Sequence, residues 1–142
     1  MPGLVGRVPP RPGKSVIGAA TSGRSARPPK ASAAVPCAQD ARPQDIVGRF
    51  GGEEFIVFLP GAELEETYAF AERVRTAVGE ERVSVADGAE FSVTISAGVA
   101  CIPGCAADLE EAIRRADDRL LAAKRHGRNR VVANDELARP AA

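Results

Sequence analysis

Two glycines and two carboxylates stand next to one another in residues 51–54, where the sequence reads Gly-Gly-Glu-Glu. Strand-like apolar runs lie on both sides, at 46–50 and 55–59. Paired glycines between two such runs predict a β-hairpin, since tight hairpin turns need positive φ angles that glycine adopts freely. A tip without side chains lets a phosphate-bearing ligand approach the backbone, and the neighbouring carboxylate oxygens suit Mg²⁺. The alternative is a surface hairpin with two solvated glutamates.

A second group of candidate residues lies in the basic segment 123–130, which contains Lys124 and Arg128. A lysine acts on phosphate as a point charge and an arginine as a planar fork, so together they can hold a polyphosphate. The alternative is an ordinary basic helix end, because cations there also meet the negative end of the helix dipole.

The elements that must position these residues follow from hydrophobic periodicity. We expect a hairpin over 45–59, an amphipathic helix over 62–78, strands near 82–85 and 91–100, a helix from Asp108 to Gly127, and a last strand over 129–133. This order predicts an α/β (α+β) layered domain, with a mainly antiparallel sheet and helices packed on it.

The chain has 142 residues, which suits one domain. Residues 1–40 are rich in proline, glycine and arginine and show no apolar period, which predicts a disordered segment. We expect a partial domain over 41–134 and a loose tail over 135–142.

Charge and hydropathy exclude several classes of protein. Residues 1–39 carry six basic and no acidic residues, whereas residues 40–142 carry thirteen basic and nineteen acidic ones, a net charge of −6. A mildly acidic folded part argues against a nucleic-acid-binding surface. No apolar run approaches the roughly 20 residues of a membrane helix, and no secretion signal is evident. We therefore expect a cytoplasmic protein.

The sequence has three cysteines, Cys37, Cys101 and Cys105. An odd number in a chain without an export signal argues against a disulfide framework. Cys101 and Cys105 flank a Pro-Gly pair, as in some metal loops, but the single histidine, His126, lies in another element. Structural zinc needs four ligands, so we expect no zinc site.

Several separate motifs make the sequence resemble the GGDEF family, the diguanylate cyclases. They are Gly-Gly-Glu-Glu-Phe at 51–55, the strand at 93–100, Ala-Asp at 116–117 and the run Lys-x-x-Gly-Arg-Asn-Arg-Val at 124–131, in the family's order and spacing. The resemblance covers residues 42–132, about the C-terminal two-thirds of the family domain. It implies condensation of two GTP into cyclic di-GMP with release of pyrophosphate, by two domains that face each other as a homodimer.

The resemblance also implies roles for single residues. Glu53 is expected to ligate Mg²⁺ (or Mn²⁺) and to help activate the attacking 3′ hydroxyl, and Glu54 to complete the catalytic carboxylate set. The implied substrate-binding residues are Gly51, Gly52, Lys124 and Arg128. The glycines would let the nucleotide pack against the turn, and the two cations would hold the GTP phosphates.

A second implied site is the Arg-x-x-Asp motif formed by Arg42 and Asp45. In the family this motif binds the product and inhibits the enzyme. The resemblance therefore implies that Arg42 and Asp45 bind cyclic di-GMP, through phosphate or guanine contacts. The alternative is a chance Arg and Asp in a connecting turn.

One part of the family pattern is missing. The family domain begins with a strand and helices that bear a Phe-Asp-x-Asp-x-Phe-Lys type motif, which supplies a metal ligand and guanine contacts. Residues 1–40 contain Asp40 as their single acidic residue and no such motif. We therefore expect a hairpin without its central neighbour and weak or no activity for this chain alone. Three interpretations stay open: a partial cyclase, a degenerate domain that binds cyclic di-GMP, and a non-functional remnant.

Overall fold

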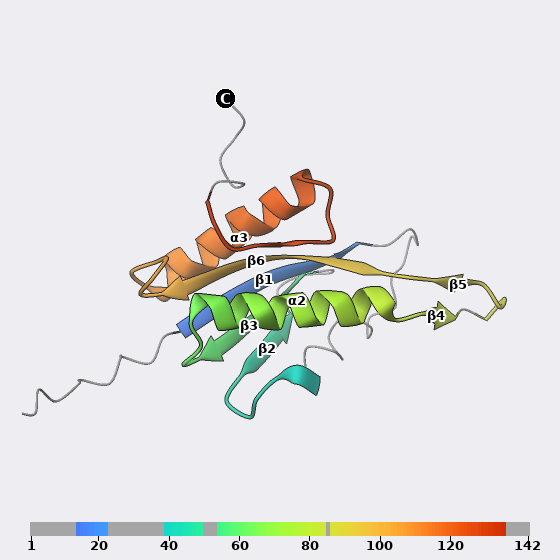
Figure 1. The fold of residues 1–142 in the computed structure, drawn as a ribbon, viewed down its shortest axis with the longest axis horizontal. Helices are drawn as coiled ribbons and strands as arrows, with labels where there is room; N and C mark the ends of the chain where they lie inside the picture. Colours follow the sequence, from blue (N-terminus) through green and yellow to red (C-terminus); the bar gives the residue numbers. More distant parts are fainter. Residues whose placement is uncertain (1–13, 23–38, 50–53, 85, 136–142) are drawn as a thin grey trace, which may run out of the picture.

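The protein, as a computed structural model, is described over residues 14–22, 39–49, 54–84 and 86–135. The strands of its main sheet are β1 (Lys14–Ser22), β2 (Ile46–Arg49), β3 (Glu54–Pro60), β6 (Thr94–Ile102) and β7 (Val131–Val132). They form a five-stranded sheet in the order β2-β3-β1-β6-β7, antiparallel except between β6 and β7. Helix α2 (Leu64–Glu80) covers one face and helix α3 (Leu109–Arg125) the other (Figure 1). The predicted layered α/β domain with a mainly antiparallel sheet is confirmed.

The middle of the sheet is β1, which pairs with β3 on one side and with β6 on the other. The prediction that residues 1–40 are disordered is therefore wrong for Lys14–Ser22. The prediction that the hairpin lacks a central neighbour is also wrong, because β1 pairs with β3. Glycine, alanine and serine make up most of β1 and have weak strand propensity, so no local pattern revealed it. Its backbone groups are instead paired by two long neighbouring strands. Apart from Gln39 and Asp40, the rest of residues 1–40 lies outside the described residues.

Strands β2 and β3 form the two arms of the predicted hairpin, with Arg49 opposite Phe55 nearest the turn. The turn itself, residues 50–53, lies outside the described residues, and with it the predicted site residues Gly51, Gly52 and Glu53. The first described residue after the turn is Glu54, at the start of β3.

The main core lies between the sheet and α2. Its largest members come from alternate positions of the strands and from one stripe of the helix: Ile17, Phe55, Val57, Leu59, Phe70, Val74, Val78, Ile95 and Val99. The period-2 alternation of β3 and the helical spacing of α2 produce this face. Thr67 occupies a buried position of α2, whereas the neighbouring Tyr68 is 41% exposed.

Helix α3 packs closely on the opposite face, and Gly98 of β6 makes this possible. A Cβ atom at Gly98 would overlap the backbone of Ala116 and Leu120 in α3. Gly18 of β1 is the register partner of Gly98, and its own Cβ position also points at Ala116. The helix therefore rests on a seam of small residues in the two central strands.

The helix starts match the sequence expectation, whereas the strand ends differ. The Asp108 side chain accepts a hydrogen bond from the Glu111 amide at the start of α3. A separate hairpin of β4 (Val83–Ser84) and β5 (Glu90–Phe91) precedes β6, so the strand expected over 91–100 is split in two. The last strand is shortened to Val131–Val132. None of the described helices is both long and apolar enough to cross a membrane.

Candidate active site

The corner beside the hairpin turn brings together two predicted site residues that are far apart in the sequence. Lys124 Nζ, from the last turn of α3, lies 3.3 Å from Glu54 Oε1 at the start of β3. Both side chains are partly exposed, at 30% and 40%. Because the pair is open to solvent, its contribution to folding stability is small. The contact matters because it holds a carboxylate and an ammonium group side by side at the start of β3.

A cavity of about 430 Å³ opens next to this pair, between α3 and the strands β1 and β3. Apolar atoms of Ile56, Ile113 and Leu120 form much of its wall. Glu54 and Asp117 supply carboxylates to the same wall, and Arg114 supplies a cation. A mainly apolar cavity with a few charged groups at its edge has the composition of a small-molecule site.

The oxygen donors at this corner suit a metal ion whose coordination is completed by the substrate. They do not suit a closed metal site made of protein ligands alone. Across the described residues, no group of three or more His, Cys, Asp or Glu side chains is close enough together to hold a metal ion. Glu54 is a hard oxygen donor, and its cross-strand partner on β1 is Ala20. Mg²⁺ commonly takes one or two carboxylates and then substrate phosphates and water, so Glu54 fits one position of such a set.

The turn after α3 is held in place by contacts to the sheet and to α2. Gly127, Arg128 and Asn129 all have positive φ angles, which turn the chain sharply from the helix into β7. The Arg128 amide donates to the Ala123 carbonyl at 3.0 Å, and the Asn129 amide donates to Ser96 Oγ at 3.2 Å. Arg75 of α2 donates to Asn129 Oδ1 at 3.0 Å. The exposed Arg128 side chain thus starts from a fixed backbone, one turn beyond Lys124.

The Arg42 and Asp45 pair forms a second, separate candidate site. The guanidinium of Arg42 contacts the Asp45 carboxylate at 3.0 Å, and the Arg42 amide donates to the same carboxylate at 2.8 Å. The Asp45 side chain is only 1% exposed, whereas Arg42 is 46% exposed. Arg42 Nη2 also donates to the Pro60 carbonyl at 3.0 Å. The hydrogen bond to Asp45 raises the pKa of Arg42 above its ordinary value.

A cavity of about 310 Å³ adjoins this pair, and its wall includes an arginine side chain that the sequence did not indicate. Arg73 of α2 lines it together with Phe70, over whose ring the Arg73 guanidinium lies at 5.7 Å. Arg73 also contacts Asp40 at 3.4 Å. In the sequence Arg73 is one of several charged residues of an amphipathic helix, so only the packing of α2 against the 40–45 segment identifies it.

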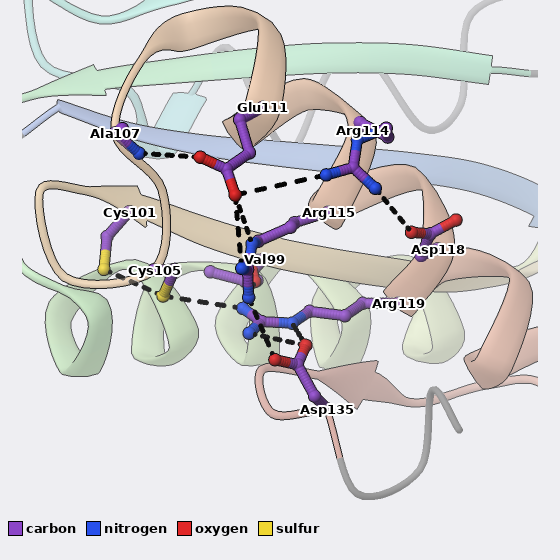
Figure 2. A network of polar contacts seen from close by, with 10 residues as sticks. All are labelled: Val99, Cys101, Cys105, Ala107, Glu111, Arg114, Arg115, Asp118, Arg119 and Asp135. Carbon is purple, nitrogen blue, oxygen red and sulfur yellow. Dashed lines mark hydrogen bonds and ion pairs between the residues drawn. The ribbon is translucent and has the colours of Figure 1, made fainter.

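A buried arginine on α3 was also missed. Arg119 is 4% exposed, and its guanidinium donates to the Val99 carbonyl and contacts Asp135 at 2.9 Å (Figure 2). Its position in the sequence contained a signal, because Ala116, Leu120 and Ala123 place it within the apolar stripe of the helix. A charged residue on an apolar stripe indicates a buried polar contact.

Comparison with known proteins agrees with this architecture. The family model described as "Diguanylate cyclase, GGDEF domain" matches residues 33–130. Diguanylate cyclase DosC of Escherichia coli (strain K12) is 41% identical over 92 residues, which are 65% of this chain and 20% of DosC. Response regulator PleD of Caulobacter vibrioides is 41% identical over 96 residues, 67% of this chain and 21% of PleD. The chain thus spans about one fifth of the length of these relatives.

A solved structure shows the same fold. The GGDEF domain of DgcB from Caulobacter crescentus, in complex with c-di-GMP, aligns with a TM-score of 0.73 at 23% identity. The alignment covers 86% of this chain and 78% of that one. Fold and sequence signature therefore define a nucleotide-cyclase type of α/β domain. The chain belongs to the GGDEF diguanylate cyclase family, since the family model matches well over half of its residues.

Proposed function

We propose that this chain forms one half-site for the condensation of two GTP molecules into cyclic di-GMP, with a second copy as the facing half-site. The observation that supports this most directly is the Glu54–Lys124 contact of 3.3 Å, which brings together the last carboxylate of the Gly-Gly-Glu-Glu signature and a lysine cation of a type suited to phosphate. Membership of the family supports the type of reaction, a nucleotidyl transfer. The proposed place of action is the cytoplasm, where GTP is available.

In the proposed reaction the chain's own residues bind and orient the nucleotide. Lys124 and Arg128 hold the phosphates, and Gly51 and Gly52 allow the nucleotide to approach the backbone of the turn. Glu54, with Glu53 beside it in the sequence, would hold Mg²⁺ or Mn²⁺, which when bound neutralises phosphate charge. The 3′ hydroxyl of one GTP then displaces pyrophosphate in line from the α-phosphate of the other, and this chemistry depends on positioning and charge.

The rate expected for this chain alone is low. Strand β1 reads KSVIGAATS and has no carboxylate, so Ala20 stands opposite Glu54 where a second acidic residue would complete the ligand set. Mg²⁺ then depends on the turn glutamates and the substrate phosphates.

The second candidate function is binding of cyclic di-GMP at Arg42 and Asp45. The cavity beside this pair, the exposed Arg42 guanidinium and the nearby Arg73 favour it, because two cations suit the two phosphates of the dinucleotide. Asp45 is an acceptor for guanine N–H groups and is held in place by Arg42.

One set of assays with the full chain separates these functions. We expect slow formation of cyclic di-GMP from GTP and Mg²⁺ or Mn²⁺, measured by chromatography, that disappears in Glu54→Gln and persists in Arg125→Ala, a neighbouring control. Titration calorimetry with cyclic di-GMP then tests the second site, and Arg42→Ala should weaken the binding. If the sample unfolds cooperatively in circular dichroism but shows neither turnover nor heat of binding, the non-functional remnant is the interpretation that remains.

A further inference from the structure

Two cysteines meet in a tight turn at the end of β6. The Sγ atoms of Cys101 and Cys105 lie 3.0 Å apart. The amides of Cys105 and Ala106 both donate to the Cys101 carbonyl, at 2.9 and 3.1 Å, which holds the two cysteines at this spacing. A Cβ atom at Gly104 would lie 2.9 Å from Cys101 Sγ, so the glycine leaves room for the sulfur. The turn is therefore built around the sulfur pair.

A buried cation faces one of the two sulfurs. Arg119 Nη1 lies 3.6 Å from Cys105 Sγ, and Arg119 also bonds the Val99 carbonyl and Asp135 (Figure 2). Cys101 is 7% exposed, whereas Cys105 is partly open to solvent. The cation and the accessibility thus both favour Cys105 as the reactive sulfur, and Cys101 lies behind it.

The acidities of the two thiols differ in the direction that this arrangement implies. Burial opposes ionisation of Cys105, but hydrogen bonds from Cys101 and Arg119 and the Arg119 charge outweigh it and lower the pKa of Cys105. Burial, and then the hydrogen bond and charge of Cys105, raise the pKa of Cys101. The charged and titratable groups that face the pair are Arg119 from α3 and, through Arg119, Asp135 from the C-terminal segment. A thiolate is the nucleophile in thiol exchange, so Cys105 attacks first.

We propose that Cys105 and Cys101 form a reversible modification site for low-molecular-weight disulfides, with Cys105 as the attacking thiolate and Cys101 as the resolving thiol. In the first step Cys105 Sγ bonds to one sulfur of the disulfide RSSR, whose S–S bond breaks and releases RS⁻. Cys101 then transfers its proton to the released RS⁻, and its sulfur bonds to Cys105 Sγ and displaces the second RS⁻. The two cysteines lose two electrons and RSSR gains them, as two thiol equivalents.

The second step needs only a short approach of the two sulfurs. A disulfide bond is about 2.05 Å long, so sulfurs now 3.0 Å apart must approach by only about 1 Å. Once Cys105 is bonded to R, its negative charge and its acceptor role are gone, and two of the causes that raise the pKa of Cys101 disappear. The resolving thiol becomes more acidic at the moment when it must react.

The test uses the full chain with Cys37→Ser, which leaves only the proposed pair. The protein is equilibrated with mixtures of reduced and oxidised glutathione, quenched with acid, alkylated and analysed by mass spectrometry. We expect a species lighter by two hydrogen atoms, resistant to alkylation until reduced, with a linked Cys101–Cys105 peptide. A glutathione adduct on Cys105 that persists while Cys101 is intact would overturn the proposal, as would no oxidation of the folded protein.

Single variants in the same background test the two roles. Cys101→Ser should stop at the glutathione adduct on Cys105, and Cys105→Ser should make the remaining thiol react about tenfold slower or more. Equal rates for the two single cysteines would contradict the assigned order.

The role of Arg119 as a positioning residue is tested by the pH profile of alkylation in the Cys37→Ser, Cys101→Ser background. Arg119→Gln should move the profile of Cys105 to higher pH, and Arg119→Lys should restore part of the shift. Arg125→Gln, an exposed site at the C-terminal end of the same helix, should leave the profile unchanged. An unchanged profile in folded Arg119→Gln would remove Arg119 from the mechanism, and the two single-cysteine variants test the pair without it.

Discussion

The two candidate sites of the hairpin region are held together in different ways. Arg42 and Asp45 are three residues apart, and their contacts are mostly local, with one further bond to the Pro60 carbonyl. Glu54 and Lys124 are 70 residues apart and meet only because β3 and α3 pack across the two central strands. The product-binding candidate is thus close to a self-contained turn, and the catalytic candidate is a result of the whole fold.

This difference makes the two candidate sites separable by mutation. A change that loosens α3 from the sheet should disrupt the Glu54–Lys124 corner, whereas the 40–45 segment keeps its own contacts and those to α2. A change in the 40–45 segment should have the reverse effect.

The largest effect is expected from Gly98→Val. A side chain at Gly98 would overlap the backbone of α3 at Ala116 and Leu120, so the helix must move off the sheet. We expect a loss of about 3 kcal/mol or more in the free energy of unfolding, measured by urea titration, at the upper end of overpacking effects. GTP turnover should be lost as well, because Lys124 is carried by α3.

Gly79→Ala is the matched control for that variant. Gly79 lies in the last turns of α2 with no atom within 4 Å of its Cβ position. Alanine there should raise stability by up to about 0.5–1 kcal/mol through helix propensity. A Gly98→Val protein with an unchanged unfolding midpoint would contradict the close packing of α3.

Arg42→Ala should remove the second site and leave the first. The substitution deletes the exposed guanidinium that is proposed to bind phosphate, and the partner of the nearly buried Asp45 carboxylate. We expect the affinity for cyclic di-GMP to fall about ten- to hundredfold, measured by calorimetry, as a charge-assisted contact is lost. GTP turnover per folded molecule should change little, and Arg82→Ala, in the segment between α2 and β4, should alter neither quantity.

The contrast between the sites also explains what the sequence could predict. The hairpin arms, α2, α3 and the Asp108 cap have local signals, and Arg42 and Asp45 are one motif, so their contact follows from spacing alone. Lys124 and Glu54 were expected at one site only through the family resemblance, because no local pattern links residues 70 apart.

Strand β1 and Arg119 show why the remainder was missed. Most residues of β1 are glycine, alanine or serine, which have weak strand propensity, and the strand is specified by β3 and β6 on its two sides. Arg119 is buried because Asp135 and the Val99 carbonyl compensate its charge and polar groups, and these partners are 16 and 20 residues away. Both are tertiary effects that override local propensity.

Ala20→Asp tests whether metal binding at the Glu54–Lys124 corner is limited by the residue opposite Glu54. Because cross-strand partners point to the same face, an aspartate at this position would stand beside the Glu54 carboxylate. Two carboxylates repel each other without a metal and bind it together, so Mn²⁺ should raise the melting temperature of the variant by a few degrees. The same Mn²⁺ should shift the unchanged protein less.

Ala20→Asn is the control for that measurement, because it adds similar volume without charge. If Mn²⁺ stabilises the asparagine variant as much as the aspartate variant, the corner is not limited by a missing carboxylate. Binding of cyclic di-GMP should be the same in both variants, since Arg42 and Asp45 make no contact that depends on residue 20.

The smallest effect is expected at the start of α3, where local contacts hold the helix that carries Lys124. Glu111 accepts hydrogen bonds from the Ala107 amide and from Arg115, which lower its pKa below the ordinary 4.5. Ionised Glu111 therefore favours folding, fully above pH 4.5 and progressively less as the pH falls through the folded-state pKa. Glu111→Gln should lower the urea midpoint slightly at pH 7, and the difference should vanish near pH 3.

Glu110→Gln, the exposed neighbour, should show a smaller change. An equal loss of stability at both pH values would mean that Glu111 acts through its shape and not its charge. A loss of stability as large as that of Gly98→Val would mean that local capping, and not packing on the central strands, holds the Glu54–Lys124 corner.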